Sequence, residues 1–210
     1  GSGNILWTKA YGGATGDEYG RAVWPTVDGG YIIAGSTNTT SFSAGGDDIY
    51  LVRIDNVGNH LWSKAIGGSA GDEVANAVQQ TGDGGFIIAG RTGSFGPGGD
   101  DVYLIKTDAS GNIQWEKTFG GNPDDDVAFS VRQTNDAGYI ITGTTKSFGA
   151  INNDVYLLHT DVYGNLEWSK RYGGAGADEA YYAEQADDGG YIVTGRSSTF
   201  SQGGSDFYVL

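Results

Sequence analysis

One motif occurs four times in this chain and limits its fold more than any other feature. The copies read GNILWTKAYGGATGDE from Gly3, GNHLWSKAIGGSAGDE from Gly58, GNIQWEKTFGGNPDDD from Gly111 and GNLEWSKRYGGAGADE from Gly164. Successive copies are 55, 53 and 53 residues apart. A regular period of this length is typical of proteins built from repeated structural units. We therefore interpret the whole chain as one repeat array.

Each repeat consists of short strands. Residues 72–120 contain a run that ends at Thr81, a Gly-Asp-Gly-Gly turn, and an apolar run from Phe86 to Ala89. After a glycine-rich loop, DVYLIKTD alternates with a period of two, and IQWEKTF follows the turn ASGN. This pattern indicates four consecutive antiparallel strands, and no stretch carries a helical period.

Four such units predict an all-β fold, a four-bladed β-propeller made of four-stranded antiparallel blades. We expect a single propeller domain with blades over about 17–67, 72–120, 125–173, and 178–210 together with 3–12. Trp7, Trp62, Trp115 and Trp168 recur in the fourth strand of each unit. A large ring at this place can fill the wedge between neighbouring blades, which predicts a structural role.

The two ends of the chain match each other. The sequence opens on a fourth strand, Asn4 to Tyr11, and stops in a third strand, Asp206 to Leu210. We expect the N-terminal strand to complete the last blade and close the ring. Closure between two chains, as an eight-bladed ring, is the alternative. A monomer is expected, because pairing within one chain has the higher effective concentration.

The acidic residues concentrate in one class of loop. In an antiparallel meander, the loops between second and third strands lie at the same end as the crossings to the next blade. We predict an acidic loop face there, with the ligand-face residues Glu18, Asp48, Glu73, Asp101, Asp126, Asp154, Glu179 and Asp206. The first acid of each acidic pair is expected to hydrogen-bond loop amides. Ca²⁺ binding is the alternative, with candidates Asp17, Asp72, Asp125 and Asp178, and no other cofactor is indicated.

Charge and composition exclude several functions. The formal net charge of −14 disfavours binding to nucleic acid or to an anionic membrane. No apolar run is long enough to span a bilayer, so we expect no membrane insertion. Without cysteine there are no disulfides and no thiol chemistry. A protein or a glycan remains as the expected partner.

Catalytic residues are not apparent. The two histidines, His60 and His159, occupy non-equivalent positions in different repeats, and neither pairs with a nucleophile. Near-symmetric carboxylates give no unique acid and base. We predict no enzymatic activity. Only modest features break the symmetry, among them Trp24 and a one-residue deletion before Tyr181.

The motifs GNxxWxKxxGGxxxDE, DGGYIIxGxT and DxYL resemble the Gly-rich β-propeller repeats of large secreted and surface proteins of bacteria and archaea. The resemblance covers essentially the whole chain. It implies an extracellular or cell-surface location, a rigid binding or structural role, and a place as a module of a longer chain. The expected activity is protein binding through the acidic loop face. A carbohydrate-binding propeller is the alternative, because four loop aromatics recur: Phe42, Phe95, Phe148 and Phe200.

Overall fold

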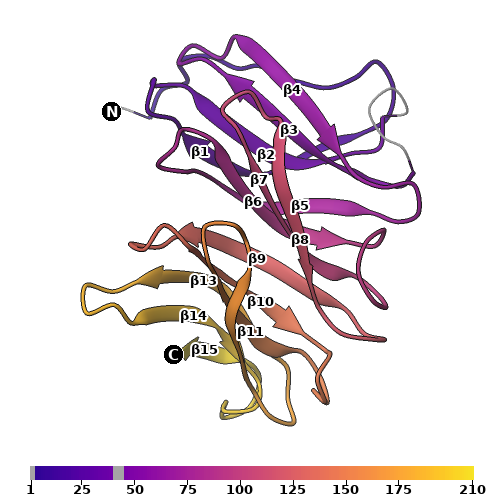
Figure 1. The fold of residues 1–210 in the computed structure, drawn as a ribbon, viewed down its shortest axis with the longest axis vertical. Helices are drawn as coiled ribbons and strands as arrows, with labels where there is room; N and C mark the ends of the chain where they lie inside the picture. The colour runs from indigo at the N-terminus through magenta and orange to yellow at the C-terminus, as the bar shows by residue number, and fades with distance from the viewer. Residues whose placement is uncertain (1–2, 40–44) are drawn as a thin grey trace.

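The computed structural model describes residues 3–39 and 45–210, and these form antiparallel sheets and no helix (Figure 1). Accordingly, no helix in this part of the chain is long and apolar enough to cross a membrane. Fifteen strands in the described residues make four sheets, three with four strands and one with three. Each sheet contains consecutive strands in chain order. The predicted all-β class and the antiparallel strand repeats are confirmed.

The strands follow the repeats. Sheet 1 contains β1 (Glu18–Pro25), β2 (Tyr31–Thr37), β3 (Asp48–Ile54) and β4 (His60–Ile66). Sheet 2 contains β5 (Glu73–Gln80), β6 (Phe86–Thr92), β7 (Asp101–Thr107) and β8 (Ile113–Phe119). Sheet 3 contains β9 (Asp126–Gln133), β10 (Tyr139–Thr145), β11 (Asp154–Thr160) and β12 (Leu166–Tyr172). Sheet 4 contains β13 (Asp178–Gln185), β14 (Tyr191–Ser197) and β15 (Asp206–Val209).

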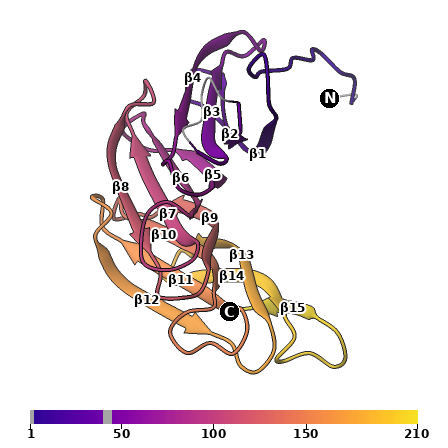
Figure 2. The same ribbon diagram turned by 90° about the vertical axis from the view of Figure 1, so that its right-hand side faces the viewer.

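The four sheets stack face to face along an arc (Figure 2). Strands β4, β8 and β12 follow the convex side of this arc, and the first strands of the sheets follow the concave side. Apolar layers fill the space between sheets, with Ile32 and Leu51 of sheet 1 packed on Ile88 and Ile105 of sheet 2. Burial of each such side chain contributes about 1.5–3 kcal/mol, so every sheet depends on its neighbour.

The recurring tryptophans lie in these layers. Trp62 meets Phe86 edge-on at 6.0 Å, and Trp115 meets Tyr139 at 5.8 Å. A Cβ placed on Gly111, the turn glycine of the next sheet, would stand 2.8 Å from the Trp62 ring. Glycine is therefore required there, since its φ of 76° is also unfavourable for other residues.

Glutamines at the ends of the first strands add polar links between sheets. The side-chain oxygen of Gln80 accepts a hydrogen bond from the backbone of Val27 at 2.9 Å. The equivalent bonds join Gln133 to Gly82 and Gln185 to Asn135. These bonds fix the order and registry of neighbouring sheets.

The predicted closure of the ring is absent. Residues 3–12 form no strand and do not pair with β15. Instead, the Tyr11 hydroxyl donates to the Gly58 carbonyl at 2.7 Å, and Trp7 lies against Gly58. The two chain ends lie at opposite ends of the arc (Figures 1 and 2). With the turn between sheets that this structure has, four sheets leave the circle open (Figure 2).

Removing a tryptophan between two sheets should test this dependence. Trp115→Ala is expected to lower the free energy of unfolding by about 3–5 kcal/mol, because the cavity would open the layer against Tyr139. Tyr163→Ala is the control, because it removes an exposed ring in the turn between β11 and β12. Urea denaturation followed by circular dichroism measures both. Equal losses would contradict the packing role.

Candidate functional site

The loops that carry the predicted ligand-face acids meet at one end of the sheets. At the start of each later sheet, a backbone N–H donates to a carbonyl in the loop of the sheet before it. The pairs are Glu73 to Asp47, Asp126 to Asp100, and Asp178 to Asn153, each at 2.6 Å. This end of the molecule is therefore a continuous hydrogen-bonded network.

Most of the predicted ligand-face acids are not accessible to a partner. Glu18 is half-buried and Asp206 is exposed. The other six are buried, namely Asp48, Glu73, Asp101, Asp126, Asp154 and Glu179. A protein surface cannot touch them without opening the loops.

The carboxylate of the second acid in each acidic pair joins neighbouring loops by hydrogen bonds. The Glu73 carboxylate accepts hydrogen bonds from the Gly68 backbone at 2.6 Å and the Thr92 hydroxyl at 2.7 Å. It also accepts from the Ser94 backbone at 3.1 Å. Equivalent contacts are made by Glu18, Asp126 and Asp178. Each carboxylate thus satisfies loop donors that would otherwise be unpaired.

The sheet register corrects the assignment of Asp178. Asp178 pairs with Ser197 as Glu73 pairs with Thr92, so it belongs with the second acids. Ala177 takes the place of the first acid. The deletion lies before β13, and counting from the paired glycines shifted the alignment by one. The predicted fourfold set of calcium candidates is therefore reduced to three.

Two of the remaining first acids, Asp72 and Asp125, accept hydrogen bonds from loop amides, and Asp125 also pairs with a lysine. Asp72 accepts from the Asp47 backbone at 3.0 Å, and Asp125 accepts from the Asp100 backbone at 3.2 Å. Lys146 lies 3.3 Å from Asp125. The exposed Asp17 uses its own backbone N–H to bond the Asn38 side chain. These contacts favour the loop-amide role over the calcium alternative, which stays a prediction.

One group of side chains in the described residues has the spacing of a metal site, namely Asp136, His159 and Glu167. His159 Nδ1 lies 2.9 Å from Glu167 Oε2, while Nε2 lies 3.7 Å from Asp136 Oδ2. One nitrogen of His159 and one oxygen of each carboxylate lie within 4.8 Å of one another, so the group could hold a metal ion, although the two carboxylates approach opposite ring nitrogens. The arrangement suits a basic side chain that bridges two acids.

The other sheets support this structural interpretation of His159. Its place is taken by Arg53 in sheet 1 and Lys106 in sheet 2, each paired with the aspartate of the first turn. Burial raises the pKa of Asp83, but hydrogen bonds from Lys106 and Thr81 outweigh it and lower the pKa to about 2. His159 also stacks on Trp168 at 5.3 Å. It is therefore a packed structural residue.

A buried carboxylate pair occupies the junction of sheets 2 and 3. Oxygens of Asp101 and Asp126 both lie within 2.8 Å of the point where a Cβ on Gly120 would stand. Burial, and then the charges of Asp126 and Asp100, raise the pKa of Asp101 to about 6. Neither oxygen of Asp101 has a hydrogen-bond partner within the described residues. Burial and the neighbouring carboxylates therefore disfavour the ionised form of Asp101.

The exposed groups with functional chemistry lie elsewhere, on the concave side of the arc. We call this the inner-strand surface, formed by side chains of β1, β5, β9 and β13. It contains two adjoining cavities. The first, of about 350 Å³, is lined by Arg21, Arg91, Asp125 and Lys146, among others. The second, of about 230 Å³, is lined by an aromatic and arginine group: Trp24, Phe129, Arg132, Tyr181 and Tyr182.

Arg132 organises the second cavity. Its guanidinium lies 4.6 Å from the centre of the Trp24 ring and 4.8 Å from that of Tyr182. The rings of Phe129 and Tyr181 lie 5.6 Å from each other and line the same cavity. The three partners Trp24, Arg132 and Tyr182 come from sheets 1, 3 and 4, so this cluster exists only in the assembled array.

β-bulges supply part of this surface. Each first strand contains one bulged residue that has no partner in the ladder, and bulges commonly re-aim a side chain at functional sites. The bulged residues are Arg21, Asn76, Phe129 and Tyr181. They differ in every sheet, although the bulge occurs at the same place in each ladder. A comparison of the four repeats position by position would have found them, whereas the predicted breaks in symmetry, among them Trp24 and the deletion, did not include the bulges.

The loop aromatics considered for carbohydrate binding pack on one side and are exposed on the other. Phe95 contacts Tyr103 at 5.7 Å, and Phe148 contacts Tyr156 at 5.7 Å. Phe200 stacks on Tyr208 at 5.4 Å. All three are partly exposed, and Phe42 lies outside the described residues. The loop rings are anchors that keep an accessible edge.

Comparison with known proteins informs the fold alone. No family model and no curated protein matches this sequence. A solved protein of unknown function from Bacteroides caccae superposes on this chain with a TM-score of 0.50 and 14% sequence identity. The match covers 90% of this chain and 57% of that protein. Sqt1 from Chaetomium thermophilum gives a TM-score of 0.46 and 13% sequence identity, and the match covers 91% of this chain and 42% of that protein. This chain thus spans little more than half of the first protein and less than half of the second.

The carboxylate pair predicts a pH-dependent effect of Asp101→Asn. A folded-state pKa of about 6 means that ionised Asp101 destabilises the fold. This cost is absent below the unfolded pKa near 4 and is complete above about pH 6. The variant should therefore gain about 1 kcal/mol more unfolding free energy at pH 8 than at pH 5. Urea denaturation at both pH values measures the gain. Asp124→Asn, at an exposed acid, is the control, and a pH-independent gain in Asp101→Asn would contradict the raised pKa of Asp101.

Proposed function

We propose that this chain is a non-catalytic module that binds a protein partner on its inner-strand surface. Tryptophan, tyrosine and arginine are the residues that most often dominate binding energy at protein interfaces. All three types meet in the Trp24, Arg132 and Tyr182 cluster. The observation that carries the proposal is this cluster, whose three residues differ from their counterparts in the other sheets and meet on one exposed surface beside the bulges.

Charge indicates what kind of partner segment fits. The chain as a whole is strongly acidic, yet Arg21 and Arg132 make no ion pair with any described residue. Arg91 and Lys146 in the first cavity are already paired with Asp100 and Asp125. A partner segment with carboxylates and apolar side chains would meet unpaired arginine and aromatic rings at once.

This proposal moves the binding surface away from the acidic loop face. The loop acids are mostly buried and bonded to loop amides, so they stabilise the junctions between sheets. The exposed and irregular groups lie on the concave side. As the repeat resemblance implies, we propose that the module acts outside the cell or at its surface, as a segment of a β-propeller.

Carbohydrate binding is the second candidate. Tyr181 and Phe148 each present a partly exposed ring, and exposed rings can stack on sugars. The arginine that occupies the faces of Trp24 and Tyr182 favours a protein instead. The two candidates use different rings and are separable by mutation.

Peptide selection tests the proposed function. Short random peptides displayed on phage are selected on the immobilised chain, and the affinity of the selected peptides is measured by titration calorimetry. Arg132→Ala should weaken binding about 30-fold, the equivalent of about 2 kcal/mol for a central interface residue. The selected peptides should be rich in acidic residues.

Tyr163→Ala is the matched control, because Tyr163 is an exposed tyrosine in the turn between β11 and β12. It should leave peptide affinity unchanged. Peptides that bind Arg132→Ala as tightly as the parent chain would rule out the inner-strand surface. Binding to an oligosaccharide array that Tyr181→Ala abolishes, without any selected peptide, would favour the carbohydrate candidate.

A further inference from the structure

Sheet 4 leaves an apolar face uncovered. Ile192, Phe207 and Val209 are 48, 98 and 58% exposed. The residues at the same register positions in the other sheets are at most 5% exposed, because the following sheet covers them. They are Ile32, Ile49 and Leu51 in sheet 1, Ile87, Val102 and Leu104 in sheet 2, and Ile140, Val155 and Leu157 in sheet 3. Sheet 4 therefore carries a face shaped to receive another sheet.

Sheet 1 carries the complementary face. Val23 is 62% exposed, whereas its equivalents Val78, Val131 and Ala183 are at most 3% exposed. Ile33 is half-buried, and its counterparts in the later sheets are buried. In those sheets, the preceding sheet covers these positions. Sheet 1 thus presents a face that can pack on a preceding sheet such as sheet 4.

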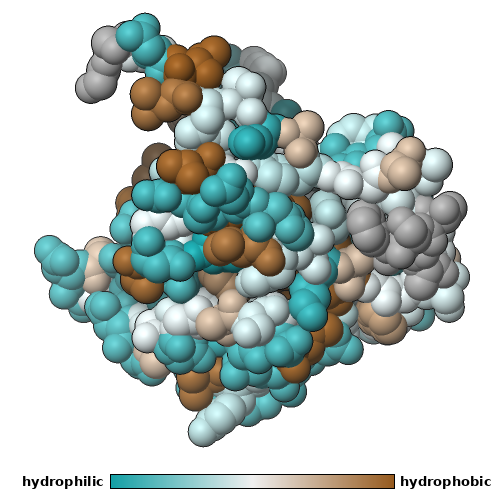
Figure 3. All heavy atoms as spheres, turned by 90° about the horizontal axis from the view of Figure 1, so that it is seen from above, coloured by the Kyte–Doolittle hydropathy of each residue, from teal (hydrophilic) through white to brown (hydrophobic). Residues whose placement is uncertain are grey.

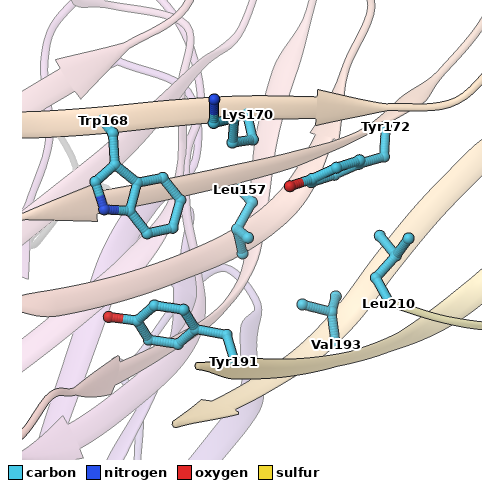
Figure 4. A pocket seen from close by; sticks show the side chains of 7 residues that line it. All are labelled: Leu157, Trp168, Lys170, Tyr172, Tyr191, Val193 and Leu210. Atoms are coloured by element: carbon cyan, nitrogen blue, oxygen red, sulfur yellow. The ribbon is translucent and has the colours of Figure 1, made fainter. Parts of the chain in front are cut away.

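A groove marks the missing strand of sheet 4. It measures about 520 Å³ and is lined by Leu157, Trp168, Lys170, Tyr172, Tyr191, Val193 and Leu210 (Figure 4). In the earlier sheets the turn before the fourth strand covers the equivalent tryptophan, with Gly111 on Trp62 and Gly164 on Trp115. Sheet 4 has three strands in the described residues, and no such turn glycine covers Trp168.

Residues 3–12 have the sequence of the strand that this groove lacks. They repeat the fourth-strand motif from its turn glycine onward. Aligned on β15, Ala10 would face Tyr208 as Ala65 faces Tyr50. Gly3 would then cover Trp168. Asn4 would accept from Lys170, as Asn112 accepts from Lys64 and Asn165 from Lys117, both at 3.4 Å.

The segment of the same chain is at the wrong end of the arc for this role. It already lies on sheet 1 like the fourth strand of a preceding sheet, with Trp7 against Gly58 as Trp62 is against Gly111. Ile5 and Leu6 remain almost fully exposed, and hydrophobic atoms stand out on this projecting segment in Figure 3. A second copy could bring its segment and its sheet 1 to β15 together, without disturbing the contact between Trp7 and Gly58.

We propose that a second copy of this chain docks head to tail on sheet 4. Its residues 3–12 become the fourth strand beside β15, and its sheet 1 packs on Ile192, Phe207 and Val209. The interface joins two different surfaces, so two copies that contact each other twice close an eight-sheet ring. In this arrangement the partner copy completes the blade formed by sheet 4.

The solution mass tests the docking. Sedimentation of the chain at physiological salt should give a multiple of the 21.9 kDa chain mass. Phe207→Asp and Val23→Asp, which each place a charge in one of the two faces, should raise the apparent dissociation constant at least about 30-fold. Val27→Asp is the matched control, since Val27 is exposed in the β1–β2 turn and outside both faces. A monomeric parent chain, or an unchanged mass for Phe207→Asp, would overturn the proposal.

Mixing the two variants tests the head-to-tail arrangement. Phe207→Asp keeps the sheet 1 face, and Val23→Asp keeps the sheet 4 face, so an equimolar mixture should form a heterodimer. A symmetric interface that pairs like faces would leave one of the two variants dimeric on its own and would give no heterodimer on mixing, which would exclude the proposed arrangement. Circular dichroism of each variant confirms that both are folded.

Cross-linking tests the strand register. The chain has no cysteine, so Ala10→Cys combined with Tyr208→Cys introduces the only thiols. Directly opposed residues of an antiparallel pair are close enough to link. Bridges between two chains are expected on a non-reducing gel. A bridge within one chain would instead show that four sheets close on themselves, and an oligomer without any bridge would refute this register.

Discussion

Face-to-face packing between consecutive sheets is the interaction on which the rest of this structure depends. Both faces of a repeat are apolar, so no sheet can bury its side chains alone. The edge-on contact of Trp62 with Phe86 and the approach of its ring to Gly111 occur again one repeat later at Trp115. The same packing explains the acids, because only ordered loops hold the sheets at this spacing. Glu73 and its equivalents order those loops.

The carboxylates of this chain therefore do more inside the molecule than on its surface. Asp83 is held ionised by Lys106 and Thr81, whereas Asp101 faces another carboxylate and resists ionisation. His159 takes the place of a lysine or arginine above a turn aspartate. An acidic composition alone does not distinguish such internal uses from an acidic binding face, since it carries no information on burial.

Local features could be predicted from the sequence, and global ones could not. The strand order, the turns and the tryptophan positions can be predicted from any single repeat, because the same sequence pattern recurs in all four. The placement of Asp178 could not be derived, because a one-residue deletion is assigned only by the ladder to Ser197. Closure also failed as a prediction, since matching ends specify a pairing but not the turn between sheets. The Trp24 and Arg132 cluster combines residues from separate sheets, whose distance no sequence spacing gives.

The bulges in the first strands have a consequence for how such a chain can change. A bulged residue makes no ladder pair, so Arg21, Asn76, Phe129 and Tyr181 can be exchanged without breaking strand pairing. Duplication of a repeat copies its strands and turns, and a later substitution at the bulge changes the side chain that the inner-strand surface presents. Strand pairing therefore does not limit which side chain stands at a bulge, and the limits that remain come from contacts between sheets, such as the hydrogen bond from Asn76 to the Ala128 carbonyl at 2.9 Å.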